Sequence, residues 1–171
     1  MIQDTIDSIF HGNANLPDPA TAPELFEGIL QRRMMAFVID FALMLLIFIA
    51  LLVVGLIFGI VTLGLGFVTL PLIFPLAILG YYSMTLGSNA RATIGMRAMD
   101  LVLTPTRGAP LNGVRILIHP LIFWVTCWIA WPISLFIALF TPRREMVHDL
   151  LTGTLMVRRS PMVRHWRRAR A

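Results

Sequence analysis

Apolar residues fill a long stretch near the start of the chain, from residue 34 to residue 86, in which Asp40 is the only charged residue. A helix of about 20 residues is enough to cross the hydrocarbon of a bilayer, so this stretch is too long for one crossing. The glycines in Gly64–Gly66 favour a tight turn. The pattern therefore predicts two membrane-spanning helices, at residues 34–60 and 67–86.

A third apolar stretch, after those of the two predicted helices, covers residues 116–140 and is interrupted by Pro120 and Pro132. It either crosses the membrane once or forms a re-entrant pair of short helices, broken near Trp131 and Pro132, with about 12 residues in each half. Arginines precede the first helix, recur in the connection over residues 87–115 and fill the C-terminal tail, whereas the loop between the first two helices has no charge. Because cytoplasmic segments are enriched in arginine, the charges favour the re-entrant form, with the N-terminus and the tail in the cytoplasm.

The composition excludes two other classes of protein. Of the 171 residues, 57% are hydrophobic and 13% are charged, and the mean hydropathy is +0.80. Soluble domains are about 45–50% apolar and about 25% charged, and disordered chains are less hydrophobic still. We therefore predict an all-α integral membrane helical bundle. It has a polar N-terminal lead (1–31), a membrane domain (32–159) and an arginine-rich tail (160–171). The lead is predicted to end in a short amphipathic helix over residues 24–31.

The positive charge points to lipids rather than to nucleic acid. The chain has 14 basic and 9 acidic residues, every basic residue is arginine, and the net charge is +5. No nucleic-acid-binding motif accompanies these arginines, which flank apolar stretches or form a tail. We expect the tail to bind anionic lipid headgroups. The arginines expected to do so are Arg158, Arg159, Arg164, Arg167, Arg168 and Arg170.

Asp40 is the most informative residue, because it lies inside the first apolar stretch. A carboxylate in the hydrocarbon costs about 2.5–3.5 kcal/mol on insertion scales, and such groups usually face protein or water. Arg33 lies seven positions earlier, which is nearly two helical turns, so both side chains share one face of the helix. Asp40 is then either an ion or proton site that cycles between charged and neutral forms, or part of a static buried pair.

A second polar cluster covers Arg143–Asp149 and ends in the adjacent pair His148 and Asp149. The pair either contributes to a proton relay at the membrane surface, or Asp149 binds backbone N–H groups at a helix start or an arginine. His119, before Pro120, is expected to be a satisfied polar group near the membrane edge. One His–Asp pair supplies too few ligands to predict a metal site.

The sequence has no glycine-rich phosphate loop, Cys/His metal spacing or nucleophile motif, so we expect neither a cofactor nor an enzyme.

Three motifs together resemble the RDD family of bacterial membrane proteins, which is named for one arginine and two aspartates. The first is Arg33–Asp40, in which the arginine is followed by alanine and then by Ile-Asp. The second is Thr93–Arg97, in which Met96 stands where the family usually has lysine. The third is Arg143–Thr154, which combines arginines, the His-Asp pair and a Gly-Thr pair. The resemblance covers residues 32–159.

The resemblance implies a multi-pass protein of the bacterial inner membrane, in a family for which transport, including sodium–proton exchange by some members, has been proposed. Two functions follow as predictions. One is ion- or proton-coupled transport by a homo-oligomer, with Asp40 as the titrating group. The other is a non-catalytic accessory or scaffold protein, bound to a membrane protein partner, whose charged residues only lock the helices together. Whether Arg33 pairs with Asp40 or with Asp149 stays open. The residues proposed for the ion or proton site, or for the buried polar network, are Arg33, Asp40, Arg97, His148 and Asp149.

Overall fold

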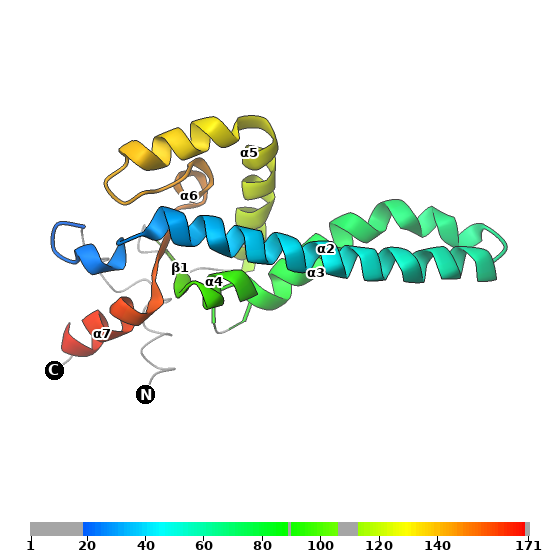
Figure 1. The fold of residues 1–171 in the computed structure, drawn as a ribbon, viewed down its shortest axis with the longest axis horizontal. Coiled ribbons are helices and arrows are strands. Elements are labelled where there is room, and N and C mark those ends of the chain that lie inside the picture. The colour runs from blue at the N-terminus through cyan, green and yellow to red at the C-terminus, as the bar shows by residue number, and fades with distance from the viewer. Residues whose placement is uncertain (1–18, 89, 106–112, 170–171) are drawn as a thin grey trace.

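Two long helices form a hairpin that projects from a broader head (Figure 1). The structure is a computed structural model that describes residues 19–88, 90–105 and 113–169, so most of the predicted N-terminal lead lies outside the described residues. The hairpin consists of α2 (Ile29–Val61) and α3 (Leu70–Leu86), which are joined through a short 3-10 helix, η2 (Leu65–Thr69). The predicted turn is confirmed, and Gly64 adopts a φ of 100° there, a conformation that favours glycine.

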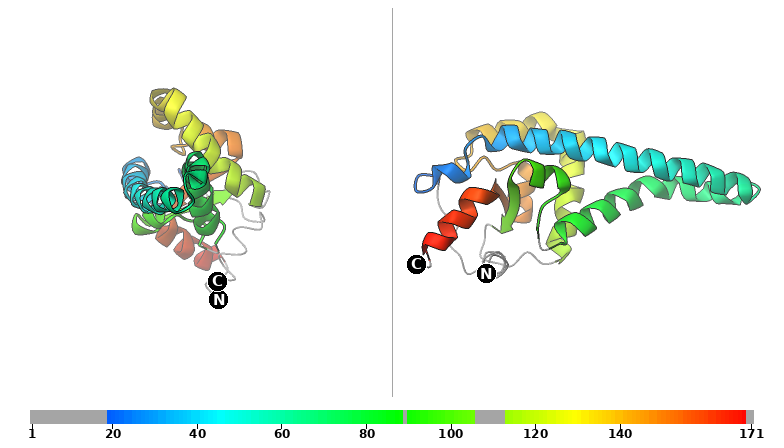
Figure 2. Two further views of the ribbon diagram at one scale, coloured as in Figure 1. Left: turned by 90° about the vertical axis from the view of Figure 1, so that its right-hand side faces the viewer. Right: turned by 60° about the horizontal axis from the view of Figure 1, so that its bottom comes forward.

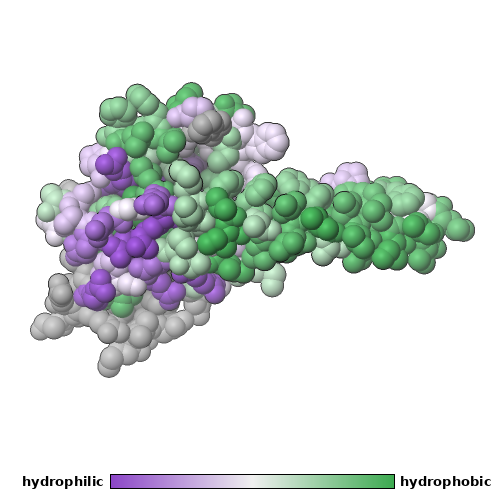
Figure 3. Space-filling view, in the orientation of Figure 1, coloured by the Kyte–Doolittle hydropathy of each residue, from purple (hydrophilic) through white to green (hydrophobic). Residues whose placement is uncertain are grey.

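Both helices of the hairpin are long and apolar enough to cross a membrane, as the sequence predicts. Among the described residues they are the two continuous helices of this kind, and a bent pair within residues 118–140 counts as a third if it forms one span. Hydrophobic side chains cover the hairpin, whereas polar side chains gather on the head (Figure 3). The chain therefore folds as an all-α membrane protein. The first helix begins five residues earlier than predicted, at Ile29 rather than at Met34.

Glycines bring the two helices of the hairpin close together. A Cβ atom on Gly59 would lie 2.1 Å from the ring of Phe67, and one on Gly55 would lie 2.7 Å from the side chain of Ile73. Glycines four residues apart form a common packing face in membrane helices, because they let a neighbouring helix approach closely. This face of α2 is therefore occupied by α3 and η2 within the same chain.

The head consists of short elements that pack around the first turns of α2 (Figure 2). These elements are η1 (Pro23–Leu25), α4 (Ile94–Ala98), β1 (Leu101–Pro105), α6 (Val147–Thr152), β2 (Thr154–Arg158) and α7 (Arg159–Ala169). Their core joins Leu25 near the N-terminus to Leu103 and Met162. Residues 24–31 therefore do not form the amphipathic surface helix that the sequence predicts. A left-handed Gly28 separates η1 from α2, and the apolar residues on both sides of it enter the core.

The strands β1 and β2 pair antiparallel, with Leu101 opposite Arg158 and Pro105 opposite Thr154. The first strand lies in the arginine-containing connection over residues 87–115, and the sequence pattern predicts neither strand. This two-stranded ribbon is thus an addition to the helical architecture. It also brings together the two chain segments that flank the third apolar stretch.

That third stretch forms α5 (Gly113–Phe140), which is sharply bent. Ala130 has non-helical angles (φ −143°, ψ 32°), and the helix bends by 107° between its halves, Ile118–Ala130 and Pro132–Phe140. Pro132 lacks a backbone N–H, and its ring disfavours a continuous helix at this point. The break lies where the sequence predicts it, and the second half leads the chain back to the head (Figure 1).

Candidate functional site

Asp40 is held by neutral donors from other parts of the chain. It lies on α2 and is 6% exposed. Its Oδ1 atom accepts hydrogen bonds from the Tyr81 hydroxyl at 2.5 Å and the Gly95 N–H at 2.7 Å, and its Oδ2 atom accepts one from the Thr93 hydroxyl at 2.6 Å. The carboxylate thus ties α2 to the end of α3 and to the start of α4.

The motif Thr93–Arg97 has a clear local role in this arrangement. Thr93 is the N-cap of α4, and its hydroxyl accepts a hydrogen bond from the Met96 N–H at 3.1 Å while it donates to Asp40. A Cβ atom on Gly95 would lie 2.2 Å from the Ala36 carbonyl oxygen. Glycine is therefore required for the N–H of residue 95 to reach the carboxylate of Asp40.

Arg33 pairs with Asp149, not with Asp40. The Nη1 atom of Arg33 lies 2.5 Å from Asp149 Oδ2, and their side chains are 4% and 0% exposed. The same carboxylate oxygen accepts a hydrogen bond from the Met146 N–H at 3.1 Å, at the start of α6. Asp149 therefore has both of the structural roles predicted for it. It pairs with an arginine, and it accepts a hydrogen bond from a backbone N–H group at the start of a helix.

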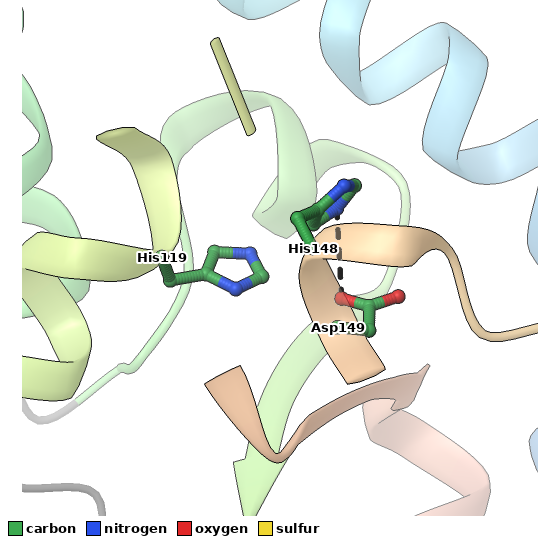
Figure 4. Close-up of side chains that lie close together, drawn as sticks. All are labelled: His119, His148 and Asp149. Carbon is green, nitrogen blue, oxygen red and sulfur yellow. Dashed lines mark ion pairs between the residues drawn. The ribbon is translucent and has the colours of Figure 1, made fainter. Parts of the chain in front are cut away.

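Two histidines lie beside Asp149 (Figure 4). His148 Nε2 lies 3.6 Å from Asp149 Oδ1. His119 comes from α5, its ring packs edge-on against that of His148, and its Nδ1 atom lies 3.2 Å and 3.1 Å from the hydroxyls of Thr152 and Thr154. His119 is thus a satisfied polar group, as expected. Its place beside His148 was not foreseen, because no sequence pattern links α5 to α6.

Burial and the charge of Arg33 shift the pKa values of His148 and Asp149. Burial lowers the pKa of His148 and outweighs the opposing charge of Asp149, while Arg33 lowers this pKa further. Burial acts to raise the pKa of Asp149, but the charge of Arg33 and the nearby histidines lower it overall. At neutral pH the Asp149 carboxyl group is therefore ionised and His148 is neutral.

Both clusters border one cavity of about 320 Å³, which is lined mainly by apolar side chains such as Phe37 and Phe123. Arg33, Asp40, His119 and His148 also line it. The Nε and Nη2 atoms of Arg33 and the Nδ1 atom of His148 are buried without hydrogen-bond partners. Pockets of about 300–1,000 Å³ with a few convergent polar groups are typical sites for small molecules. The cavity is therefore the candidate binding site.

The other predicted site residues lie elsewhere. Arg97 is exposed and donates to the Ala92 carbonyl at 3.2 Å and the Ser88 hydroxyl at 3.0 Å, so it does not join the buried clusters. Arg158 contacts the Glu27 carboxylate at 3.1 Å. The remaining arginines of the predicted lipid site follow in α7 and beyond. Arg159 is half-buried and Arg164 is exposed, whereas the side chains of Arg167 and Arg168 and the whole of Arg170 lie outside the described residues.

Comparison with curated proteins and with solved structures found no match to this chain. Comparison with family models found a match, in which the model of the RDD family covers residues 28–153. The matched range covers α2 to α6, and it contains Arg33, Asp40, Asp149, the first two motifs and the third motif up to Gly153. The chain therefore belongs to the RDD family.

Proposed function

We propose that this protein is an ion- or proton-coupled membrane transporter whose solute or ion site is the cavity at the base of the hairpin. The observation that carries the proposal is the buried carboxylate of Asp40, which lines this cavity without a cationic partner among the residues that bind it. Buried ionisable groups in membrane segments commonly mark ion and proton pathways.

The partners of Asp40 suit a group that gains and loses a proton. Hydroxyls both donate and accept, so Tyr81 and Thr93 remain hydrogen-bonded to the carboxyl in either protonation state. A proton on Oδ2 would reverse the hydrogen bond from Thr93, which also caps α4. Protonation of Asp40 is therefore coupled to the start of α4, which supplies a means of opening or closing the cavity.

We further propose that transport requires a homo-oligomer or a membrane protein partner. The hairpin exposes most of its apolar side chains, and the cavity lies at its base rather than along it. One copy therefore has a binding site but little enclosed space along the membrane-spanning helices. A neighbouring subunit that packs on the exposed apolar faces would complete the pathway.

The proposed location is the bacterial inner membrane, with the head in the cytoplasm. The turn of the hairpin, residues 61–66, carries no charge, whereas the head carries arginines on many elements. This asymmetry matches the positive-inside rule. Arg159, Arg164 and the arginines that follow are proposed to bind anionic headgroups at that surface.

A second candidate is an accessory or scaffold protein without transport activity. The specific observation in its favour is that three neutral donors from two segments hold Asp40, so this carboxylate also works as a static link between α2, α3 and α4. In that case the cavity is a docking site or a packing defect, and no flux depends on it.

Flux into proteoliposomes separates the two candidates. Wild type, Asp40→Asn and Asp100→Asn are compared with pH- and sodium-sensitive dyes, and detergent monodispersity is measured for each. Asp100 accepts from Ser160 at the surface of the head, so its variant removes an equal charge outside the cavity. The transporter proposal expects flux in the wild type and the control but not in a monodisperse Asp40→Asn. Wild-type flux that persists in Asp40→Asn, or no wild-type flux with any common cation, refutes it and favours the scaffold.

A further inference from the structure

We propose that His119, His148 and Asp149 form a three-ligand site for a divalent transition metal ion such as zinc. All three are buried, and one donor atom of each lies within 4.8 Å of the others (Figure 4). The inference does not depend on transport, because it concerns equilibrium binding of the metal alone.

The spacing of the donors is close to that of a zinc site. Ligand atoms at about 2.0–2.1 Å from a tetrahedral zinc ion lie roughly 3.3 Å from one another. His148 Nε2 and Asp149 Oδ1 are 3.6 Å apart, and all three donor atoms lie within 4.8 Å of one another, so metal binding requires them to close by up to about 1.5 Å. His119 approaches from α5 and faces this pair (Figure 4). Packing of α5 on α6 thus brings together ligands that are far apart in the sequence.

Asp149 has an unused atom at this place. Its Oδ1 atom is buried and has no hydrogen-bond partner, although the side chain is 0% exposed. Buried acceptors without a donor are uncommon in native structures, and an unseen ion is one of the standard explanations. The other oxygen, Oδ2, already binds Arg33 and the Met146 N–H, which fixes the carboxylate so that Oδ1 stays available.

His119 has the outer hydrogen bonds that metal-binding histidines usually have. Such a histidine commonly donates the N–H of its second ring nitrogen to a nearby acceptor, which fixes the ring and leaves the first nitrogen as the ligand. The Nδ1 atom of His119 lies within hydrogen-bond distance of the Thr152 and Thr154 hydroxyls. This contact leaves Nε2 for a metal ion.

The charge of Arg33 bears on which ion the site prefers. The guanidinium of Arg33 binds the carboxylate of Asp149 and repels a second cation. An ion that binds mainly through its charge therefore has a low affinity for this site. Two imidazole nitrogens and one carboxylate are a ligand set that favours zinc, cobalt or iron over calcium or magnesium. Since His119 and His148 also line the cavity, an open position on the metal would face the space where a solute binds.

Metal titration of the purified, tag-free protein in detergent tests the proposal. The chelator-treated protein is titrated with Co²⁺, whose visible absorption reports histidine ligands, and Zn²⁺ is then added as a competitor. The variants are His119→Gln and His148→Gln. The matched control is a His11→Gln/His165→Gln double variant, which replaces the other two of the four histidines.

The expected result is one equivalent of bound metal in the wild type and in the control, with affinity at least about 100-fold lower in either site variant. Calcium and magnesium are expected not to compete. Thermal unfolding without metal checks that a variant is folded, and one folded site variant is enough for the test. No metal bound by the wild type, or equal binding by a folded site variant, overturns the proposal.

Discussion

The ion pair between Arg33 and Asp149 joins the base of the hairpin to the head, and both side chains are withdrawn from water. Loss of one partner leaves a buried charge without compensation. Replacement of both by apolar side chains of similar size removes the cost of desolvating them together with their attraction. Single and double substitutions are therefore expected to affect stability very differently.

Arg33→Met is expected to lower the free energy of unfolding by about 3–5 kcal/mol, because Asp149 is left buried and unpaired. The double variant Arg33→Met/Asp149→Leu is expected to recover most of this loss. Unfolding in detergent measures both. Arg97→Met is the control, since Arg97 is exposed and its substitution is expected to change stability by about 0.5 kcal/mol or less. Equal losses in the single and double variants would contradict an uncompensated charge as the cause.

The sequence indicates which residues matter at the site but not which of them meet. Arg33 and Asp40 share a helical face, yet Arg33 binds Asp149, which lies 116 positions later in the chain. Asp40 instead takes neutral partners, among them Tyr81, which no charge or motif marks in the sequence. Local spacing reveals neither pairing, because the partners come from other elements that only packing brings near α2.

At the scale of secondary-structure elements, a close contact between the backbones of α4 and α2 determines how the two helices pack. Gly95 lies against the Ala36 carbonyl, so even a methyl group has no room there. The neighbouring atom belongs to the backbone of a long helix and cannot move away as a flexible side chain does. The contact therefore fixes the separation of the two helices.

Gly95→Ala is expected to destabilise the protein by about 1–3 kcal/mol, because the added carbon forces α4 away from α2 and stretches the hydrogen bond to Asp40. Gly80→Ala is the matched control. A Cβ atom at Gly80, on α3, meets nothing within 4 Å, and alanine favours a helix over glycine by about 1 kcal/mol. Thermal unfolding in detergent compares the two. Equal stabilities for both variants would contradict the close contact.

The helices of the hairpin could be predicted because their length and apolarity are local properties of the sequence. The strands could not. In β1, Leu101, Val102, Leu103 and Thr104 are all buried, so the strand lacks the alternation of apolar and polar residues that marks a half-buried strand. Its partner, β2, lies beyond the whole of α5, and only the folded head pairs them. A short buried strand of this kind has no distinctive local pattern.

At the scale of the whole molecule, the length of the hairpin matches the thickness of a membrane. From Asp40 to Val61, a helix rises by about 32 Å, compared with about 30 Å for the hydrocarbon of a bilayer. We propose that Asp40 lies level with one edge of the hydrocarbon and that the uncharged turn reaches the other edge. This placement lowers the cost of burying the carboxylate, because water is near the head.

Cysteine labelling tests this placement. In a Cys127→Ser background, which removes the chain's single cysteine, Leu63→Cys lies at the turn and Arg97→Cys lies on the head. A membrane-impermeant maleimide is expected to label position 63 from outside and position 97 only after the membrane is opened. Labelling of both positions from the same side would exclude a hairpin that spans the bilayer.

The bent helix α5 allows a similar test. Because β1 and β2 pair, the segments before and after α5 lie together in the head, and we propose that α5 enters the membrane and returns. Pro142→Cys, at an exposed position just after α5, is therefore expected to label from the same side as Arg97→Cys. Labelling from the side of Leu63→Cys would show that α5 crosses instead.

The separation of Arg33 from its partner also affects how the protein is made. The ribosome adds roughly 5–20 residues per second, so Arg33 waits on the order of ten seconds for a partner 116 residues later. The hairpin ends at Leu86, well before Asp149, so it is synthesised while this guanidinium is still unpaired. During that interval, we expect lipid phosphates to be its counter-ions. A nascent chain that stops before α6 is therefore expected to have a complete hairpin with an unpaired arginine at its base. We expect quality-control proteases to recognise this exposed charge.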